Sequence, residues 1–244
     1  MIYAIGDIHG MYKPMMELMA KINPKPEDEV VFMGDYIDRG PDSFKVVDQL
    51  IKWKKENPHW TFLYGNHEDI FRDFITGGAH YGMSCWFANG GKTTMESYGG
   101  HFGKIVDGEW IAPRNPEFPR EHLDFLFKET VYLYETEKYA FVHAGLVPGL
   151  FHIKANENHP DTLIWAREGF IESPFVWEKK VIFGHTADFR GQYYVPKYAG
   201  DKKRRLQPIV MANKIGIDTA SCPPAQYKLT AVELPTERFI QVKS

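Results

Sequence analysis

The segment VVFMGDYIDRG, residues 30–40, joins an apolar run to a polar turn, and this form recurs along the chain. Its first part, Val30 to Met33, is apolar and rich in β-branched and aromatic side chains. Short apolar runs that end abruptly in small and polar residues are typical of buried strands. Four other segments have the same form, and the runs with their turns are Ile2–Ile5 with Gly6–Gly10, Thr61–Tyr64 with Gly65–Glu68, Tyr139–Val142 with His143–Gly145, and Val181–Phe183 with Gly184–Thr186.

Helical patterns separate the first three of these predicted strands. Apolar residues recur at helical spacing over Tyr12–Ile22 and over Ser43–Trp53. Strands that alternate with helices predict an α/β domain. In open α/β sheets ligands bind beyond the carboxyl ends of the strands. The polar turns lie at these ends, so they are where we expect the functional site.

The rest of the chain departs from this alternation. We expect residues 74–130 to form a largely helical insertion that caps one side of the site. Strand-like runs after residue 191 predict a second, partly antiparallel sheet, and these runs are Ile209–Met211, Ile215–Asp218, Tyr227–Leu234 and Phe239–Val242. No low-complexity linker divides the sequence, so residues 1–244 are predicted to form one domain.

Composition narrows the function classes. The 244 residues carry 29 Lys and Arg against 32 Asp and Glu, a formal net charge of −3, which gives no reason to expect nucleic acid or a membrane as partner. The basic run Lys202–Arg205 is expected to be a solvated loop. No apolar stretch approaches the ~18 residues of a membrane-spanning helix. With no visible signal peptide at residues 1–10 and only Cys85 and Cys222 as cysteines, we expect a cytoplasmic protein.

Side chains with metal-ligand chemistry follow all five predicted strands. The candidate ligands are Asp7, His9, Asp35, Asn66, His143 and His185. Carboxylate, imidazole and amide donors suit Mn, Fe or Zn better than Ca. This set exceeds what one tetrahedral ion needs, whereas two ions that share a carboxylate would use all of it. A lone His after a strand is usually an ordinary turn or core residue, but ligand types at five strand ends together predict a metal centre.

The same turns resemble a known family. GDIHG, GDYIDRG, GNHE, HAG and GHT, in this order between residues 6 and 186, are similar to the signature of the phosphoprotein phosphatase branch of the metallophosphoesterases. The block NGGKTTMESYG at residues 89–99 also resembles the small bacterial and phage members of the bacteriophage lambda type. The resemblance implies a calcineurin-like metallophosphoesterase fold, in which two packed β-sheets are flanked by helices.

The resemblance also implies a role for each candidate residue. Asp7 and His9 would bind the first metal ion, Asp35 would bridge both ions, and the second ion would be completed by Asn66, His143 and His185. The ions would be divalent, with Mn²⁺ favoured over Fe or Zn, and a water or hydroxide between them would be the nucleophile. His67 would be the general acid, oriented by Asp38. Arg39 and Arg167 would bind the substrate phosphate.

These roles predict a hydrolase that removes phosphate from phosphoserine and phosphothreonine, with phosphotyrosine as a further candidate. The partner would thus be a phosphorylated protein or a small phosphoester. Symmetrical diadenosine tetraphosphate hydrolases, which release ADP, share nearly all these motifs and are the alternative. They tend to have Asp after the third-motif histidine, and Glu68 at that position favours the phosphatase. Near its end the chain departs from its small bacterial relatives, because Pro223 and Pro224 stand close after Asp218-Thr219.

Overall fold

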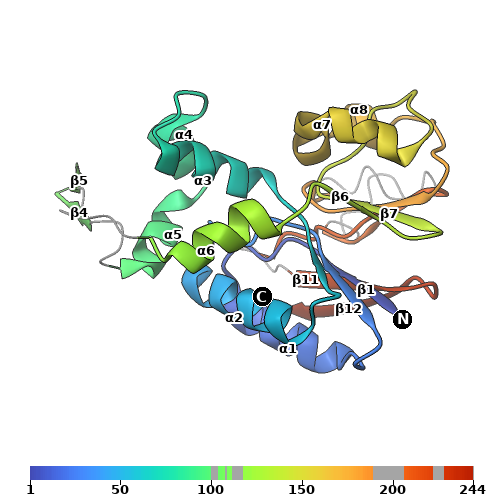
Figure 1. The fold of residues 1–244 in the computed structure, drawn as a ribbon, viewed down its shortest axis with the longest axis horizontal. Coiled ribbons are helices and arrows are strands. Elements are labelled where there is room, and N and C mark those ends of the chain that lie inside the picture. The colour runs from blue at the N-terminus through green and yellow to red at the C-terminus, as the bar shows by residue number, and fades with distance from the viewer. Residues whose placement is uncertain (100–103, 108, 112–117, 189–205, 222–227, 244) are drawn as a thin grey trace.

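Two stacked mixed β-sheets form the centre of the protein (Figure 1). The computed structural model describes residues 1–99, 104–107, 109–111, 118–188, 206–221 and 228–243. The first sheet has the order β12-β11-β1-β2-β3, with bounds Arg238–Lys243, Lys228–Leu234, Ile2–Ile5, Glu29–Phe32 and Thr61–Phe62. The second has the order β6-β7-β8-β10-β9, with bounds Leu133–Glu135, Tyr139–Val142, Lys180–Phe183, Lys214–Gly216 and Ile209–Val210. The prediction of an α/β fold with two packed sheets is therefore confirmed.

The central strands β1, β2, β7 and β8 are apolar on both faces, and both of these faces are buried. Successive side chains of a strand point to opposite sides of its sheet. Val31 of β2 and Ile182 of β8 lie in the apolar layer between the two sheets. Their neighbour Phe32 instead packs under the helices of the first sheet, and Phe183 packs under those of the second. Continuous apolar runs are the expected pattern for strands covered on both sides.

Helices cover the two outer faces of this sandwich (Figure 1). Helices α1 (Tyr12–Ile22) and α2 (Ser43–Glu56) lie on the first sheet, whereas α7 (Pro160–Trp165) and α8 (Glu168–Ile171) lie on the second, after the 3-10 helix Ile153–Asn158. The predicted strand–helix alternation is thus observed. It also sets the strand directions, because β1, β2 and β3 run parallel and so end at the same edge.

The predicted insertion is mostly helical and shares the core of the first sheet. Its elements are the end of α3 (Asn66–Thr76), then α4 (Gly82–Ala88), α5 (Gly91–Ser97), α6 (Arg120–Asp124) and the π-helix Phe125–Glu129. Trp86 and Met95 pack in the same apolar cluster as Phe32 of β2. A short antiparallel ribbon, β4 (Lys104–Val106) with β5 (Glu109–Ile111), lies within the insertion and was not predicted.

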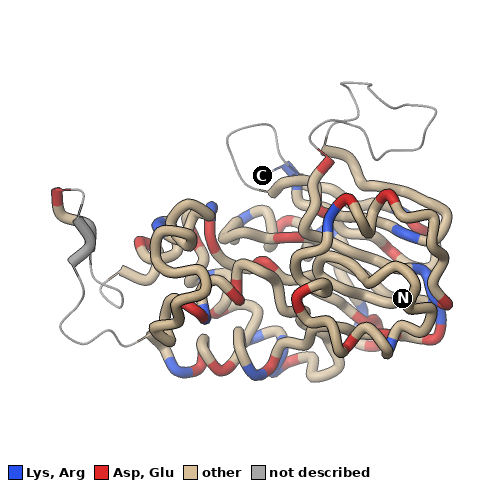
Figure 2. The backbone as a smooth tube through the Cα atoms, turned by 90° about the horizontal axis from the view of Figure 1, so that it is seen from above, with Lys and Arg blue, Asp and Glu red and all other residues tan. Residues whose placement is uncertain are grey.

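The later predicted runs form strands β9 to β12, but the expectation that they make a second sheet of their own was wrong. Strands β9 and β10 join β8 in the second sheet, whereas β11 and β12 join β1 in the first. A strand's own sequence does not specify its partners, because these depend on tertiary packing. The basic run at 202–205 and the prolines at 223 and 224 lie outside the described residues. Figure 2 shows acidic and basic residues intermixed along the described chain. Within the part of the chain that the structure describes, no helix is both long and apolar enough to cross a membrane.

A buried lysine ties the second sheet to α8. Lys214 of β10 is 1% exposed, and its Nζ donates to the carbonyl oxygens of Phe170, Ile171 and Ser173 at 2.8 to 2.9 Å. These carbonyls lie at the end of α8, where a helix leaves its last carbonyls unpaired and favours a positive charge. The contact holds the segment that begins at Arg167, the second predicted phosphate ligand.

Removing this lysine should destabilise the protein. The Lys214→Met variant leaves two buried carbonyls and one half-buried carbonyl without their donor, so we expect its free energy of unfolding to fall by about 2–4 kcal/mol at neutral pH. Burial lowers the pKa of Lys214 to about 8, below the ~10.4 of an unfolded lysine. Between these two pH values the unfolded wild type binds more protons than the folded wild type. The difference in free energy of unfolding between the wild type and Lys214→Met should therefore grow as pH rises from about 8 to ~10.4.

Urea unfolding of both proteins measures this difference. Lys180→Met is the control, because Lys180 forms only a half-exposed ion pair with Glu237 and such pairs contribute about 0–1 kcal/mol. A Lys214→Met variant as stable as Lys180→Met would show that the three carbonyl contacts contribute nothing.

Candidate metal centre and active site

The polar turns meet at one edge of the sandwich, and their backbone is unusually constrained. Asp35, His9 and His185 have positive φ angles of 52°, 47° and 60°, a region that is rare outside glycine and that costs about 1–3 kcal/mol per residue. Gly34 is needed beside them, because a Cβ there would lie 2.9 Å from both Gly65 N and His143 Nδ1. Strained backbone of this kind clusters at functional sites.

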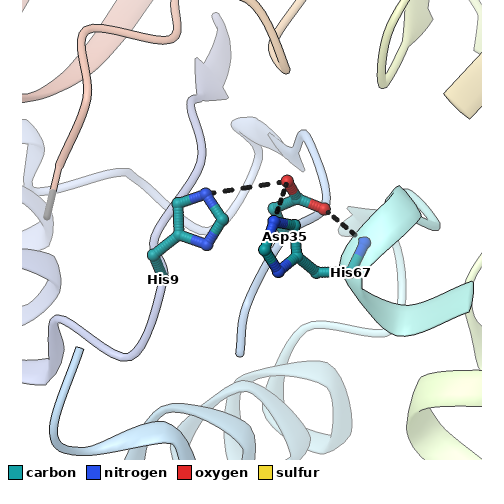
Figure 3. A group of neighbouring side chains, drawn as sticks. All are labelled: His9, Asp35 and His67. Atoms are coloured by element: carbon teal, nitrogen blue, oxygen red, sulfur yellow. Dashed lines mark hydrogen bonds and ion pairs between the residues drawn. The ribbon is translucent and has the colours of Figure 1, made fainter. Parts of the chain in front are cut away.

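Asp35 lies at the centre of the site. Its Oδ2 faces the Nε2 atoms of His9 and His67 at 3.6 and 3.9 Å, and its Oδ1 lies 3.3 Å from His143 Nε2; Figure 3 shows the first two contacts. Burial opposes ionisation, but His143 and His67 lower the pKa of Asp35 well below its ordinary value. The two oxygens of this carboxylate therefore face two different groups of imidazoles, as a bridging ligand requires.

The first group of donors surrounds His9. Its Nδ1 lies 3.0 Å from the carbonyl oxygen of Ile37, which can only accept, so Nδ1 carries the proton. The unprotonated Nε2 faces Asp35 and accepts from a guanidinium nitrogen of Arg39 at 2.7 Å. Burial, Arg39 and His67 lower the pKa of His9 well below its ordinary value. The imidazole is thus held neutral, in the form that binds metal ions.

Asp7 lies between the ends of β1 and β8, close to Asp35, His143 and His185. Its two oxygens accept the backbone N–H of His185 at 2.9 and 3.2 Å. Burial and the neighbouring Asp218 raise the pKa of Asp7 well above its ordinary value. A buried carboxylate of this kind is stabilised as an anion by a nearby cation.

The second group gathers around Asn66, the first residue of α3. Asn66 Oδ1 lies 3.0 Å from His143 Nε2 and 2.8 Å from His185 Nδ1. His143 Nδ1 lies 2.7 Å from the carbonyl oxygen of Met33 and is therefore its protonated nitrogen, which leaves Nε2 facing two acceptor oxygens. Burial alone would lower the pKa of His143, but Asp35 and Asp7 raise it to about 9. The carboxylates around the second group therefore stabilise a positive charge at this place.

A pair of divalent cations fits these donors. His185 Nε2 is buried and has no hydrogen-bond partner among the described residues. Two sets of buried side chains could each surround an ion. The first set is His9, Asp35 and His67, and the second is Asp35, His143 and His185. Mixed nitrogen and oxygen donors suit Mn, Fe or Zn. The residues present are thus compatible with two ions that share Asp35.

His67 and Asp38 form a buried pair next to Asp35. His67 Nδ1 lies 2.7 Å from Asp38 Oδ2, which accepts its proton and orients the ring. His67 Nε2 points toward Asp35 and lies 2.9 Å from a guanidinium nitrogen of Arg39. Another nitrogen of Arg39 lies 2.7 Å from His9 Nε2. Arg39 therefore stands at the point where the first group and the His67–Asp38 pair meet.

Arg167 stands beside the second group. One of its guanidinium nitrogens donates to the His185 carbonyl oxygen and to Thr186 Oγ1, both at 3.3 Å. The side chain is otherwise exposed. The structure thus brings the predicted ligands, the His67–Asp38 pair and both arginines to the same edge of the sandwich.

Two further buried acidic residues, Glu68 and Asp218, lie at this edge, and the sequence did not predict that they contact the site residues. Glu68 is fully buried and accepts the N–H groups of Asp35, Tyr36 and Gly65 at 2.9 to 3.1 Å, so it holds the two turns together. Its place three residues after the helix cap Gly65 is the capping-box position, a signal that could have indicated this. Asp218 is 5% exposed and influences Asp7 from a distant part of the chain, which no local signal reveals.

Comparison with known proteins agrees with this geometry. The family model "Calcineurin-like phosphoesterase" matches residues 1–207. The chain is 25% identical over 212 residues to serine/threonine-protein phosphatase 2 of Salmonella typhimurium, covering 80% of this chain and 85% of that protein. It is 28% identical over 172 residues to the protein of the same name from Escherichia coli, covering 67% of this chain and 66% of that one.

Solved structures share the fold at low sequence identity. One, whose assignment as a diadenosine tetraphosphatase is itself provisional, has a TM-score of 0.62 at 18% identity and covers 100% of this chain and 93% of that one. A serine/threonine phosphatase from Saccharomyces cerevisiae has a TM-score of 0.54 at 15% identity, covering 99% and 78%. The named bacterial relatives are consistent with the phosphoprotein phosphatase branch. The chain belongs to the calcineurin-like phosphoesterase family.

Proposed function

We propose that this protein is a metal-dependent phosphomonoesterase that hydrolyses phosphoserine and phosphothreonine, with phosphotyrosine as a further substrate. The observation that carries the proposal is the buried His67–Asp38 pair beside the imidazoles around Asp35. A proton donor next to a metal-type donor set is what an alkoxide leaving group requires. Two bacterial relatives named serine/threonine-protein phosphatase support this substrate class.

Two divalent ions, Mn²⁺ by preference and Fe or Zn otherwise, would be held by the predicted ligands. The first would be bound by Asp7 and His9, the second by Asn66, His143 and His185, and Asp35 would serve both. When bound, such ions activate water and neutralise charge on the phosphate oxygens. The neutral imidazoles of His9 and His185 are ready for this role without first losing a proton, because burial lowers both pKa values well below the ordinary range.

The protein's own groups would handle the proton and the phosphate. In hydrolysis, the oxygen of water joins phosphorus and the bond from phosphorus to the serine or threonine oxygen breaks. With both ring nitrogens protonated, His67 gives the Nε2 proton to that departing oxygen, while Asp38 holds Nδ1 and stabilises the charged ring. This requires Arg39, which donates to Nε2 at 2.9 Å in this structure, to turn from Nε2 to the phosphate. Arg39 and Arg167 bind the phosphate oxygens through their planar guanidinium groups.

Symmetrical hydrolysis of diadenosine tetraphosphate uses the same groups and is the rival reaction. A paired assay separates the two. Protein stripped with a chelator and restored with Mn²⁺ is given a phosphoserine peptide or diadenosine tetraphosphate at equal concentration. We expect rapid release of inorganic phosphate and little ADP. Dominant release of ADP would overturn the choice of substrate class and leave the metal ligands as proposed.

The proposal extends to the location of the reaction and to the kind of partner. Its substrate is a phosphorylated protein or a small phosphoester in the cytoplasm, with neither nucleic acid nor a membrane as partner. The formal net charge of −3 supports this, as does the intermixing of acidic and basic residues along the described backbone (Figure 2).

Loss of Arg167 should weaken substrate binding more than it slows the chemical step. Among the described residues, the Arg167 side chain donates hydrogen bonds to the His185 carbonyl oxygen and Thr186 Oγ1 and to no proposed ligand side chain, so Arg167→Ala should keep both metal ions. Since a charged hydrogen bond to phosphate is worth about 1.5–3 kcal/mol, KM for the phosphoserine peptide should rise about 10- to 100-fold. Arg238→Ala is the control, since that arginine pairs with Glu233 on β11. An unchanged KM would remove Arg167 from the phosphate site.

A further inference from the structure

The insertion contacts the catalytic turn directly, through Asp38. Trp86 Nε1 of α4 donates to Asp38 Oδ1 at 3.0 Å, and Thr94 Oγ1 of α5 donates to the same oxygen at 2.7 Å. The other oxygen, Oδ2, accepts His67 Nδ1 at 2.7 Å. Each oxygen of this fully buried carboxylate therefore has its own partners. The carboxylate cannot rotate away from His67 without breaking both contacts with the insertion.

The hydroxyl of Thr94 is used completely in this arrangement. Its proton goes to Asp38 Oδ1, and its oxygen accepts the backbone N–H of Asp38 at 2.8 Å. Ser43 Oγ lies 3.0 Å from Thr94 Oγ1. Ser43 must be the donor in this hydrogen bond, because a hydroxyl has one proton and that of Thr94 is already donated to Asp38. Thr94 thus fixes both the side chain and the backbone of Asp38.

The backbone at this turn needs such support. Asp38 and Arg39 have consecutive positive φ angles of 70° and 67°, a conformation that persists only where the surroundings hold it. The Arg39 N–H donates to the Gly90 carbonyl oxygen at 3.2 Å. Gly90, in the turn between α4 and α5, has φ 96°, and a Cβ there would lie 2.6 Å from Arg39 N. A glycine at this place lets the insertion approach the catalytic turn.

We propose that Thr94 and Trp86 are positioning residues for the Asp38–His67 pair, which makes the α4–α5 turn part of the catalytic apparatus rather than a cap over it. This inference rests on the proposed role of His67 as general acid. It also gives a function to the segment NGGKTTMESYG, whose glycine and threonine are the ones that touch Arg39 and Asp38.

The proposal has a signature in the choice of leaving group. A serine alkoxide departs only if it receives a proton, so its release depends on how well His67 is oriented. p-Nitrophenolate is a stable anion and departs without that help. Loss of a positioning contact should therefore slow the phosphoserine peptide strongly and p-nitrophenyl phosphate little, whereas general damage to the fold slows both.

The experiment compares kcat on these two substrates for Thr94→Val, Thr94→Ser and Ser97→Ala, each loaded with Mn²⁺ and checked for metal content. We expect Thr94→Val to lose about 10- to 100-fold on the phosphoserine peptide, the range for a residue that orients an active-site group, and less than about 3-fold on p-nitrophenyl phosphate. Thr94→Ser should recover most of the loss, because it keeps the hydroxyl.

Ser97→Ala is the matched control on the same helix. Its hydroxyl joins α5 to Phe44 N of α2 and does not touch Asp38, so this variant loosens the insertion without changing the pair. We expect wild-type rates on both substrates. If Thr94→Val does not fold, Trp86→Phe serves instead, since it removes the N–H donor to Asp38 Oδ1 along with part of the buried ring and should show the same split.

Two results would overturn the inference. One is an equal loss on both substrates, and the other is a Ser97→Ala variant that matches Thr94→Val. Failure of the proposed function looks different, because then His67→Asn itself would show no preference between the two leaving groups or the wild type would release no phosphate from either substrate.

Discussion

The His67→Asn variant will hydrolyse a phosphoserine peptide about 100- to 10,000-fold more slowly than the wild type, the range expected for loss of a general acid. Asn cannot supply a proton to the departing serine oxygen, yet it fills similar space and can still donate to Asp38. Because the proposed ligands do not include His67, the variant should retain two metal ions per chain. Steady-state kinetics and elemental analysis of the purified variant measure the two quantities.

Metal content decides between two roles that the geometry allows for His67. Its Nε2 is close enough to His9 and Asp35 for the three residues to surround an ion, so a variant that loses one ion would identify His67 as a ligand. His122→Asn is the matched control, since His122 is a buried histidine of the insertion whose Nδ1 pairs with the Tyr98 hydroxyl at 2.8 Å. Full activity of His67→Asn on the peptide would remove the acid assignment altogether.

The Asp35→Asn variant should lose both metal ions and nearly all activity. Its carboxylate faces His9 and His67 with one oxygen and His143 with the other, and among the described residues it is the member that the two ligand groups share. Even partners that only orient a ligand are worth about 10–100-fold in metal affinity. We therefore expect at least about 100-fold weaker Mn²⁺ binding by titration calorimetry and activity below about 1% of wild type.

The fold should tolerate this change, so a loss of metal binding can be attributed to the missing ligand and not to unfolding. Asn keeps the Oδ1 that accepts the His67 backbone N–H at 3.1 Å. Asp28→Asn is the control, because Asp28 is also buried but lies at the start of β2 and accepts the Lys25 N–H. Wild-type metal affinity in Asp35→Asn would show that Asp35 does not bridge the ions.

The strands and the meeting of their polar turns could be predicted because they depend on local pattern and on one topological rule. Apolar runs such as Val30–Met33 are buried on both faces and read as strands at once. Parallel strands end at the same edge, which brings Asp35 and His9 together although they are distant in sequence. Their roles remain proposals that the variants test.

What escaped prediction depends on contacts between distant segments. No predicted strand precedes His122 and no sequence pattern marks it as buried, yet it is 4% exposed and packs against Tyr98 and Phe44. Thr94 and Trp86 reach Asp38 across about fifty residues of sequence, and the pattern within the insertion gives no sign of this. Short-range periodicity predicts which face of a helix or strand is buried, but it does not predict which polar atom of a distant segment that face will contact.

One titration tests the central claim, that two metal ions at this edge make the protein a phosphomonoesterase. Protein stripped with a chelator is given a phosphoserine peptide, and phosphate release is followed as Mn²⁺ is added while bound metal is counted. We expect no release without metal and full activity only when two ions per chain are bound. Release that does not depend on added metal, or none after two ions have bound, would contradict the claim.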